Sequence, residues 1–198
     1  MRAKFIREAA DVRRQALIEA TAQCLAKKGV GGTSVRAICA RAGVSSGLLT
    51  HYFDGVDALI LATYRDVGSK VSAAMEQAIE DAGPVPCDRL RAFLQSNFRP
   101  PVLDSALLAT WIAFWSLVKT SPEIAAAHAE IYGASRIALE ALLRDAVPQM
   151  TAAQARIAAI SLTALVDGLW LELCLDPATF SDVEAQAMVE QAMLQLMT

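Results

Sequence analysis

The sequence predicts an all-α protein, and three features support this fold class. Alanine and leucine are abundant among the 198 residues and β-branched residues rarely form runs, which favours helix over strand. Apolar residues recur at intervals of three and four, as on the buried side of a helix. Capping residues and Gly or Pro breaks separate these stretches. We therefore expect about nine helices, an N-terminal three-helix part in residues 1–53 and an antiparallel helical part in residues 54–198.

The N-terminal part contains signals for three helices. Their expected ranges are Arg13–Lys28, Ser34 to Gly43, and Ser45 to Tyr52. Gly29 can end the first helix, because glycine readily takes the positive φ of a helix C-cap. Ser34, preceded by Thr33, and Ser45 are good N-cap residues for the next two helices.

The rest of the chain contains signals for six further helices. Their expected positions are Asp54 or Gly55 to Asp81, about Asp88–Phe98, Asp104–Lys119, from Ser121-Pro122 onward, Thr151 to about Leu175, and from Ser181 onward. The Pro84-Val85-Pro86 and Pro100-Pro101 segments break the chain, because proline cannot sit inside a helix. The last two helices begin with a Ser or Thr followed three residues later by Gln or Glu, which is the capping-box pattern.

Neither a membrane segment nor a metal site is expected. The longest uncharged run, Ser105–Val118, is shorter than the roughly 20 residues needed to span a bilayer, and the N-terminus lacks the apolar segment of a signal peptide. The four cysteines are scattered without metal-ligand spacing. We expect a cytoplasmic protein with reduced, structural thiols, one of which could alternatively sense oxidants.

The charge is distributed unevenly. Residues 1–53 contain nine Lys or Arg against three Asp or Glu, whereas the remaining residues contain nine against eighteen, although the net charge of the whole chain is only −3. A basic N-terminal part on an acidic body is typical of a protein that meets a polyanion at one end. A chance imbalance is the alternative, unless the basic part also contains a DNA-reading motif.

Residues 33–53, TSVRAICARAGVSSGLLTHYF, predict such a motif. Two short helices are separated by Ala42-Gly43-Val44, where Gly43 can take positive φ and Val44 can fill the angle between the helices. The second helix would then expose small, polar and aromatic side chains suited to the major groove. An ordinary helical hairpin with a polar surface is the competing interpretation.

This segment resembles the DNA-binding domain of the TetR family of bacterial repressors. Members have a first helix that ends in Gly, a Thr/Ser-capped second helix, an Ala-Gly-Val turn and a recognition helix that ends in an aromatic pair next to His. The matching residues here are Gly29, Thr33-Ser34, Ala42-Gly43-Val44 and His51-Tyr52-Phe53.

The resemblance implies roles for individual residues. Bases would be read by Arg36, Ser46, Gly47, Leu48 and Thr50, and phosphate or packing contacts would come from Ser34, Ser45, His51 and Tyr52. One departure is that the Lys often found after the aromatic pair is missing, since the chain continues with Asp54-Gly55-Val56-Asp57. DNA affinity would then depend more on arginines, and on helix N-termini that can bind phosphate.

Tryptophans and an aspartate suggest a site for a small cation. Trp111 and Trp115 are four residues apart, and Asp167 and Trp170 are three apart. Aromatic rings and a carboxylate suit a quaternary ammonium ion. Filling of the core by the same rings is the alternative. The segments TWIAFW at residues 110–115 and ALVDGLWLELCL at residues 164–175 are similar to the BetI subgroup, which implies choline or a related compound as effector.

The last two helices predict a homodimer. The helix Ala152 to Leu175 lacks charge from Ile157 through Val166 and is apolar around most of its circumference, so it must bury two sides. One side would pack in its own chain and the other, with the final helix, against a second chain in a four-helix bundle. Complete burial within a monomer is the alternative.

Together these features predict a repressor that binds a pseudo-palindromic DNA duplex and is released by a small-molecule effector. A regulator of efflux or catabolic genes with a different hydrophobic effector is the runner-up. An enzyme is not expected, because His51 lies in the predicted DNA-binding helix and His128 has no carboxylate or cysteine at catalytic spacing. No P-loop, GxGxxG or GxSxG motif occurs either. No cofactor is expected. A helical interaction module that never binds DNA is the third possibility.

Overall fold

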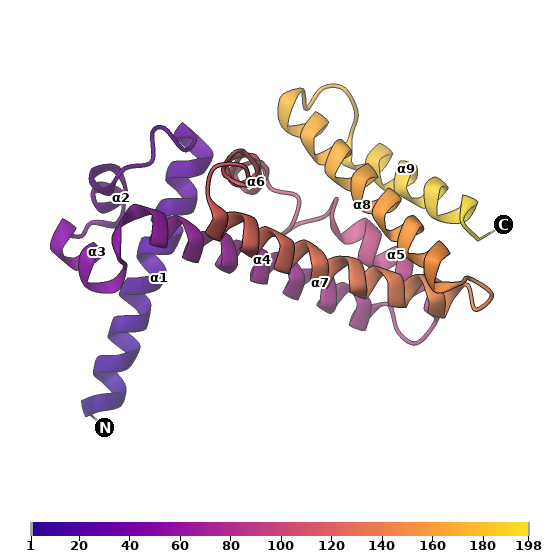
Figure 1. The fold of residues 1–198 in the computed structure, drawn as a ribbon, viewed down its shortest axis with the longest axis horizontal. Coiled ribbons are helices and arrows are strands. Elements are labelled where there is room, and N and C mark those ends of the chain that lie inside the picture. Colours follow the sequence, from indigo (N-terminus) through magenta and orange to yellow (C-terminus); the bar gives the residue numbers. More distant parts are fainter. Residues whose placement is uncertain (1, 198) are drawn as a thin grey trace. The chain divides into compact units, whose positions relative to one another are not determined.

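The computed structural model describes residues 2–197, and within them it contains nine α-helices and no strand (Figure 1). The helices are α1 Arg2–Lys28, α2 Val35–Ala42, α3 Ser46–Tyr52, α4 Gly55–Asp81, α5 Pro86–Ser96, α6 Ser105–Leu117, α7 Pro122–Ala146, α8 Ala152–Leu175 and α9 Asp182–Gln195. The predicted all-α fold is confirmed.

The N-termini of α2, α3, α8 and α9 lie where the capping residues predicted them. The hydroxyl oxygens of Ser34 and Ser45 accept hydrogen bonds from the third residues of α2 and α3, each at 3.3 Å. Both predicted capping boxes form, at Thr151 for α8 and Ser181 for α9. These bonds satisfy backbone N–H groups that have no partner inside a helix.

Several helix boundaries differ from the prediction: α5 and α6 end two residues early, at Ser96 and Leu117, and two helices start earlier than expected. Helix α1 begins at Arg2 rather than Arg13. The prediction relied on an apolar repeat that starts near Leu17, whereas the Ala, Arg, Glu and Lys residues before it favour helix through backbone propensity alone. Helix α5 begins at Pro86 rather than Asp88. Proline is favoured in the first turn, because its missing N–H group would have no partner there.

The chain divides into two compact units. One consists of Met1–Val67 with Ala109–Ala127, and the other of Gly68–Leu108 with His128–Thr198. The first unit thus contains α1 to α3, the start of α4, most of α6 and the start of α7. The functional boundary proposed after residue 53 stays a prediction.

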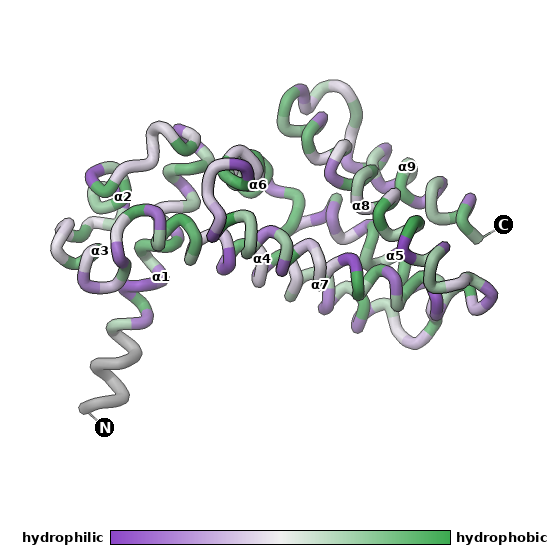
Figure 2. Tube along the Cα trace, viewed as in Figure 1, coloured by the Kyte–Doolittle hydropathy of each residue, from purple (hydrophilic) through white to green (hydrophobic). Residues whose placement is uncertain are grey.

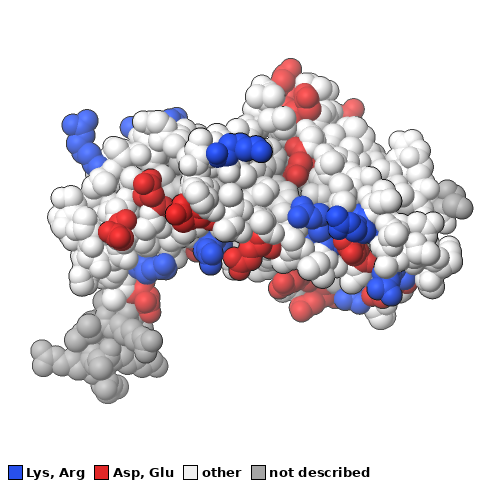
Figure 3. All heavy atoms as spheres, in the orientation of Figure 1, with Lys and Arg blue, Asp and Glu red and all other residues white. Residues whose placement is uncertain are grey.

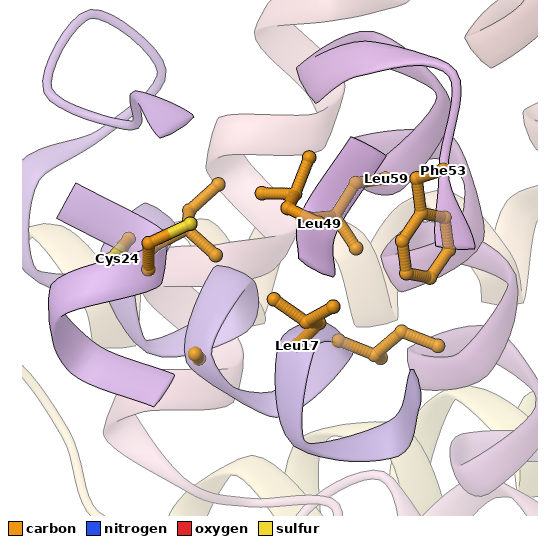
Figure 4. Packing of buried hydrophobic residues seen from close by; sticks show 9 residues of the cluster. Leu17, Cys24, Leu49, Phe53 and Leu59 are labelled. Carbon is orange, nitrogen blue, oxygen red and sulfur yellow. The ribbon is translucent and has the colours of Figure 1, made fainter. Parts of the chain in front are cut away.

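A buried apolar cluster holds the first unit together (Figure 4). Leu17 of α1, Leu49 of α3 and Leu59 of α4 are completely buried in it. Helix α6 extends this core: the Tyr64 ring of α4 lies 5.5 Å from the Trp111 ring and 4.4 Å from the Phe114 ring, measured between centroids. These contacts bury apolar side chains from α1, α3, α4 and α6.

The second unit is built around α5, α8 and α9. Helix α9 contacts both α5 and α8, and the Arg91 guanidinium of α5 donates a 2.8 Å hydrogen bond to Glu190 of α9. The Trp170 indole N–H donates a 3.0 Å bond to the Asn97 carbonyl at the end of α5. Helix α4 and helix α7 approach closely at Gly68, where a Cβ atom would lie 2.8 Å from the side chain of Ile131. Each helix is therefore fixed by at least one specific contact.

Among the described residues, α8 is the one helix long and apolar enough to cross a membrane (Figure 2). Seven of its residues are buried within the protein itself: Ala155, Ala158, Ala159, Leu162, Val166, Leu169 and Trp170. A helix of this composition also occurs in the interior of proteins that do not span a membrane, where it buries more than one side.

The turn between α2 and α3 generates a stability prediction. Gly43 has φ 68°, so Gly43→Ala should lower the free energy of unfolding by about 1 kcal/mol, because a Cβ is strained in the left-handed region. Gly47→Ala is the matched control. Gly47 lies inside α3, its Cβ would meet nothing closer than 4.0 Å, and alanine there should raise stability by about 0.5 kcal/mol. Urea unfolding measures both, and equal effects would contradict the assignment of strain to Gly43.

Candidate nucleic-acid interface and effector site

Helix α2, the turn and α3 form a helix-turn-helix. Gly43 caps α2 with φ 68° and ψ 32°, and its N–H donates to the Cys39 carbonyl. The next residue, Val44, packs against the apolar cluster of the first unit. The turn thus has the geometry that the sequence predicted: Gly43 is in the left-handed region, and the Val44 side chain packs against the apolar cluster.

Helix α3 turns one side inward and exposes the other. Leu49 is completely buried, whereas the residues predicted to meet DNA are exposed or half-buried. The exposed ones are Ser34, Arg36, Ser45, Ser46, Gly47, Thr50 and His51, and the half-buried ones are Leu48 and Tyr52. All nine therefore lie on α2, on α3 or at their N-caps, and none is fully buried.

Several side chains of this surface are already held in position. The Thr50 hydroxyl donates to the Gly47 carbonyl at 3.1 Å, so its oxygen still has lone pairs to accept a bond. The His51 and Tyr52 rings meet edge to face at 5.0 Å. Arg41 donates to Gln23 of α1, and the Arg14 guanidinium lies 5.1 Å from the centre of the Phe53 ring. These last two contacts tie α1 to α2 and to the end of α3, and the motif alone did not reveal them.

The charge around the helix-turn-helix is mixed. Asp54 and Asp57 at the start of α4 are exposed, as are Arg13, Arg14 and Arg36. Figure 3 shows acidic and basic side chains interspersed over the face that it draws. Carboxylates close to a DNA backbone repel it, so DNA affinity would depend on the exposed arginines and on backbone N–H groups.

The four residues predicted to bind an effector fall in different environments. Trp111 is buried in the first unit between Tyr64 and Phe114, and Trp115 of the same helix is half-buried. Trp170 is buried in the second unit, where its N–H is bonded to Asn97. These contacts account for the packing of Trp111 and Trp170. Their predicted role in binding a cation stays a prediction.

Asp167 belongs to a polar cluster between α7 and α8 that the sequence analysis did not identify. The Tyr132 hydroxyl donates to the Asp167 carboxylate at 3.1 Å, and the His128 ring stacks on the Tyr132 ring at 4.2 Å. Arg136 lies one further turn along α7 and acts electrostatically on both His128 and Asp167. The spacing of His128, Tyr132 and Arg136, four residues each, was visible in the sequence and places them on one side of α7.

Burial changes the proton affinity of this cluster. It raises the pKa of Asp167 to about 6, although the Tyr132 hydrogen bond and the positive charge of Arg136 act in the opposite direction. Burial also lowers the pKa of His128, and Arg136 adds to this effect. A half-buried carboxylate of this kind gains from any cation that replaces its lost hydration.

The fold and the exposed helix-turn-helix define a DNA-binding transcriptional regulator. The chain belongs to the TetR family of bacterial regulatory proteins, whose family model matches residues 17–63. The C-terminal family of BetI-type transcriptional repressors matches residues 86–197. Both parts of the predicted resemblance are thus confirmed.

Individual relatives support the same assignment. The HTH-type transcriptional regulator BetI of Serratia proteamaculans is 35% identical over 181 residues, which cover 89% of this chain and 88% of that protein. The crystal structure of a putative transcriptional regulator from Pseudomonas aeruginosa PAO1 is 40% identical, with a TM-score of 0.86 over 94% of this chain and 91% of that one. A putative transcriptional regulator from Saccharomonospora viridis, solved in complex with choline, has the same fold at 18% identity, with a TM-score of 0.77 over 90% and 93% of the two chains.

Asp167 generates a prediction on stability and pH. The folded chain keeps the Asp167 proton up to a pH of about 6, whereas the unfolded chain loses it near its ordinary pKa of 3.8, so this group lowers stability as pH rises between these values. Asp167→Asn removes the ionisation. The free energy of unfolding of the variant minus that of the parent should therefore increase by about 2–3 kcal/mol from pH 4 to pH 7.5.

Urea unfolding of both proteins at each pH measures this gain. The difference between them at a given pH cancels the opposite contribution of His128, which the two proteins share. A difference that does not change between pH 4 and pH 7.5 would contradict the raised pKa.

Proposed function

We propose that this protein is a homodimeric repressor that binds a pseudo-palindromic operator through the two copies of α3 and leaves it when a small organic cation binds. The observation that carries the proposal is the exposed helix-turn-helix in a chain of the BetI-type family. In this proposal the repressor acts on double-stranded DNA in the cytoplasm and needs no cofactor.

In this proposal the residues of α2 and α3 have two kinds of contact. Arg36, Ser46, Gly47, Leu48 and Thr50 read base edges in the major groove, and Ser34, Ser45, His51 and Tyr52 make phosphate or packing contacts. The exposure of Arg36 and the accepting capacity of the Thr50 hydroxyl support the first role. Phosphate contacts orient the helix without reading sequence.

Dimerisation is proposed to use α8 and α9. Six large apolar side chains on these helices are exposed in the single chain: Ile157, Ile160, Leu171, Leu175, Val183 and Leu194. An apolar surface of this size on two adjacent helices favours burial against another protein. Two recognition helices related by a two-fold axis then match half-sites about 34 Å apart, one turn of DNA, or further apart where two dimers share a site.

The effector is proposed to be choline or a related quaternary ammonium compound, bound with the help of Asp167. The half-buried carboxylate and the Tyr132 ring beside it offer the charge and the aromatic surface that such an ion prefers. Trp111, Trp115 and Trp170 are the further aromatic candidates. An effector releases DNA only if it binds the released conformation more tightly than the DNA-bound one. An efflux or catabolic regulator with a hydrophobic effector is the alternative, and would not depend on Asp167.

Arg36→Ala tests the DNA contacts. The variant should lose about 1–3 kcal/mol of affinity for the operator and little for random duplex, because the lost contact is to a base. Tyr52→Phe should weaken both duplexes by a similar factor. Titration of fluorescent duplexes at two salt concentrations measures each affinity. Equal losses on both duplexes for Arg36→Ala would contradict base reading, and an absence of salt-dependent binding by the parent protein would contradict DNA binding altogether.

Titration with choline, betaine aldehyde and glycine betaine tests the effector. At least one should release the operator and change tryptophan fluorescence at or below millimolar concentration, and Asp167→Asn should raise the concentration needed at least tenfold at pH 7.5. Asp145→Asn, an exposed carboxylate of α7, is the matched control and should leave the response unchanged. No response to any of the three compounds, or an unchanged response in Asp167→Asn, would contradict the proposed site.

A further inference from the structure

An open pocket of about 630 Å³ lies between α4, α5 and the segment that follows α5. Its volume is within the range of small-molecule sites in proteins. None of the residues proposed above to bind DNA or the effector lines it. The apolar part of the lining includes Ala74, Ala78, Ala82, Ala92 and Val102. Because the alanine side chains are short, they leave room between the two helices for a narrow chain.

Carboxylates gather at the end of the pocket next to the turn between the helices. Asp81 is the last residue of α4, Asp88 lies in the first turn of α5, and both line the pocket. The Arg91 guanidinium forms ion pairs with Asp88 and, at 2.8 Å, with Glu190 of α9, so two carboxylates share one positive charge. The Asp81 carboxylate accepts a 2.9 Å hydrogen bond from the neutral Gln77 amide and makes no ion pair with any residue that the structure describes. Among these groups negative charge therefore exceeds positive charge.

Arg99 lines the opposite end of the pocket. Its Nε donates a 2.9 Å hydrogen bond to Gln186 of α9, and its Nη2 donates a 2.8 Å bond to Gln95 of α5. Both partners are neutral amides, and within residues 2–197 Arg99 makes no ion pair. A guanidinium has five N–H donors, so two are used and three remain. A guanidinium held in position in this way is suited to bind a carboxylate.

We propose that this pocket binds a linear zwitterion, whose ammonium group lies beside Asp81 and Asp88 and whose carboxylate binds Arg99. The bond to Gln95 holds the Arg99 guanidinium seven residues along α5 from Asp88. Since a helix rises about 1.5 Å per residue, the two ends of the site are about 10 Å apart. A molecule with a single charge would leave one end of the pocket without its counter-charge.

Two kinds of small molecule have this chemistry. A tripeptide with free termini is about 10 Å long when extended, which matches the distance between the two ends. An ω-amino acid of similar length carries the same two charges on an aliphatic chain. The alanines of α4 and α5 would contact the middle of either molecule. The site is separate from the proposed effector site and does not depend on it.

NMR of alanine methyl groups in the full-length protein tests the proposal, with trialanine and 8-aminooctanoate as probes. At least one probe should shift the methyl signals of Ala74, Ala78, Ala82 and Ala92 with a dissociation constant in the millimolar range or tighter. The probe that binds then distinguishes a peptide from an aliphatic chain. N-acetyl-trialanine, trialanine amide, octanoate and octylamine each lack one charge, and should bind at least tenfold more weakly. No shift of these signals with either probe, or equal binding of the singly charged analogues, would overturn the proposal.

Substitution of Arg99 tests the basic end. Arg99→Gln should weaken binding of the zwitterion at least tenfold, whereas Arg99→Lys keeps the charge and should retain part of the affinity. Arg144→Gln is the matched control, because Arg144 is an exposed arginine of α7 that does not line the pocket. Unchanged binding in Arg99→Gln, or an equal loss in Arg99→Lys, would overturn recognition of the carboxylate by this charge.

Substitution of Asp81 tests the acidic end. Asp81→Asn should weaken binding of the zwitterion, and the exposed Asp145 of α7 supplies the matched control, Asp145→Asn. An equal affinity in Asp81→Asn and the parent would overturn the placement of the ammonium group. Asp167→Asn should bind the zwitterion as the parent does, so a failure of the effector proposal and a failure of this one are distinguishable.

Discussion

The orientation of the recognition helix α3 depends on the packing of one side chain, Leu49, in the core of the first unit. Helix α3 has seven residues, too few to be stable as an isolated helix. Leu49 is its one fully buried side chain, and it packs in a cluster that includes Leu17 of α1 and Leu59 of α4. The exposed side of α3 is therefore oriented by two long helices, so a polar surface can be carried by a segment with little stability of its own.

Local signals in the sequence predicted most of the fold. The caps Ser34, Ser45, Thr151 and Ser181 start helices as expected, because a side-chain oxygen acts within three residues of its own position. The early start of α1 escaped prediction, since propensity without an apolar repeat gives no clear boundary. The division of α4, α6 and α7 between two compact units could not be predicted either, because it depends on contacts between distant segments.

The candidate sites were predictable to different degrees. The DNA-binding surface follows from one continuous motif whose spacing fixes the geometry, and its residues are exposed or half-buried as that geometry requires. The hydrogen bond between Tyr132 and Asp167 joins residues 35 positions apart. The sequence could not predict it, because it depends on how α7 packs against α8. The hydrogen bond of Trp170 to Asn97 is similar, since sequence indicates an aromatic residue but not the partner of its N–H group.

The chain passes between its two compact units at residues 67/68, 108/109 and 127/128, and each passage lies inside a helix. The first unit is therefore completed by residues from the middle of the sequence. A protein truncated after residue 67 would lack the Trp111 and Phe114 rings that pack against the Tyr64 ring. Recombination that exchanges DNA specificity between relatives therefore has to transfer two separate gene segments, or keep α6 compatible with a foreign α1 and α4.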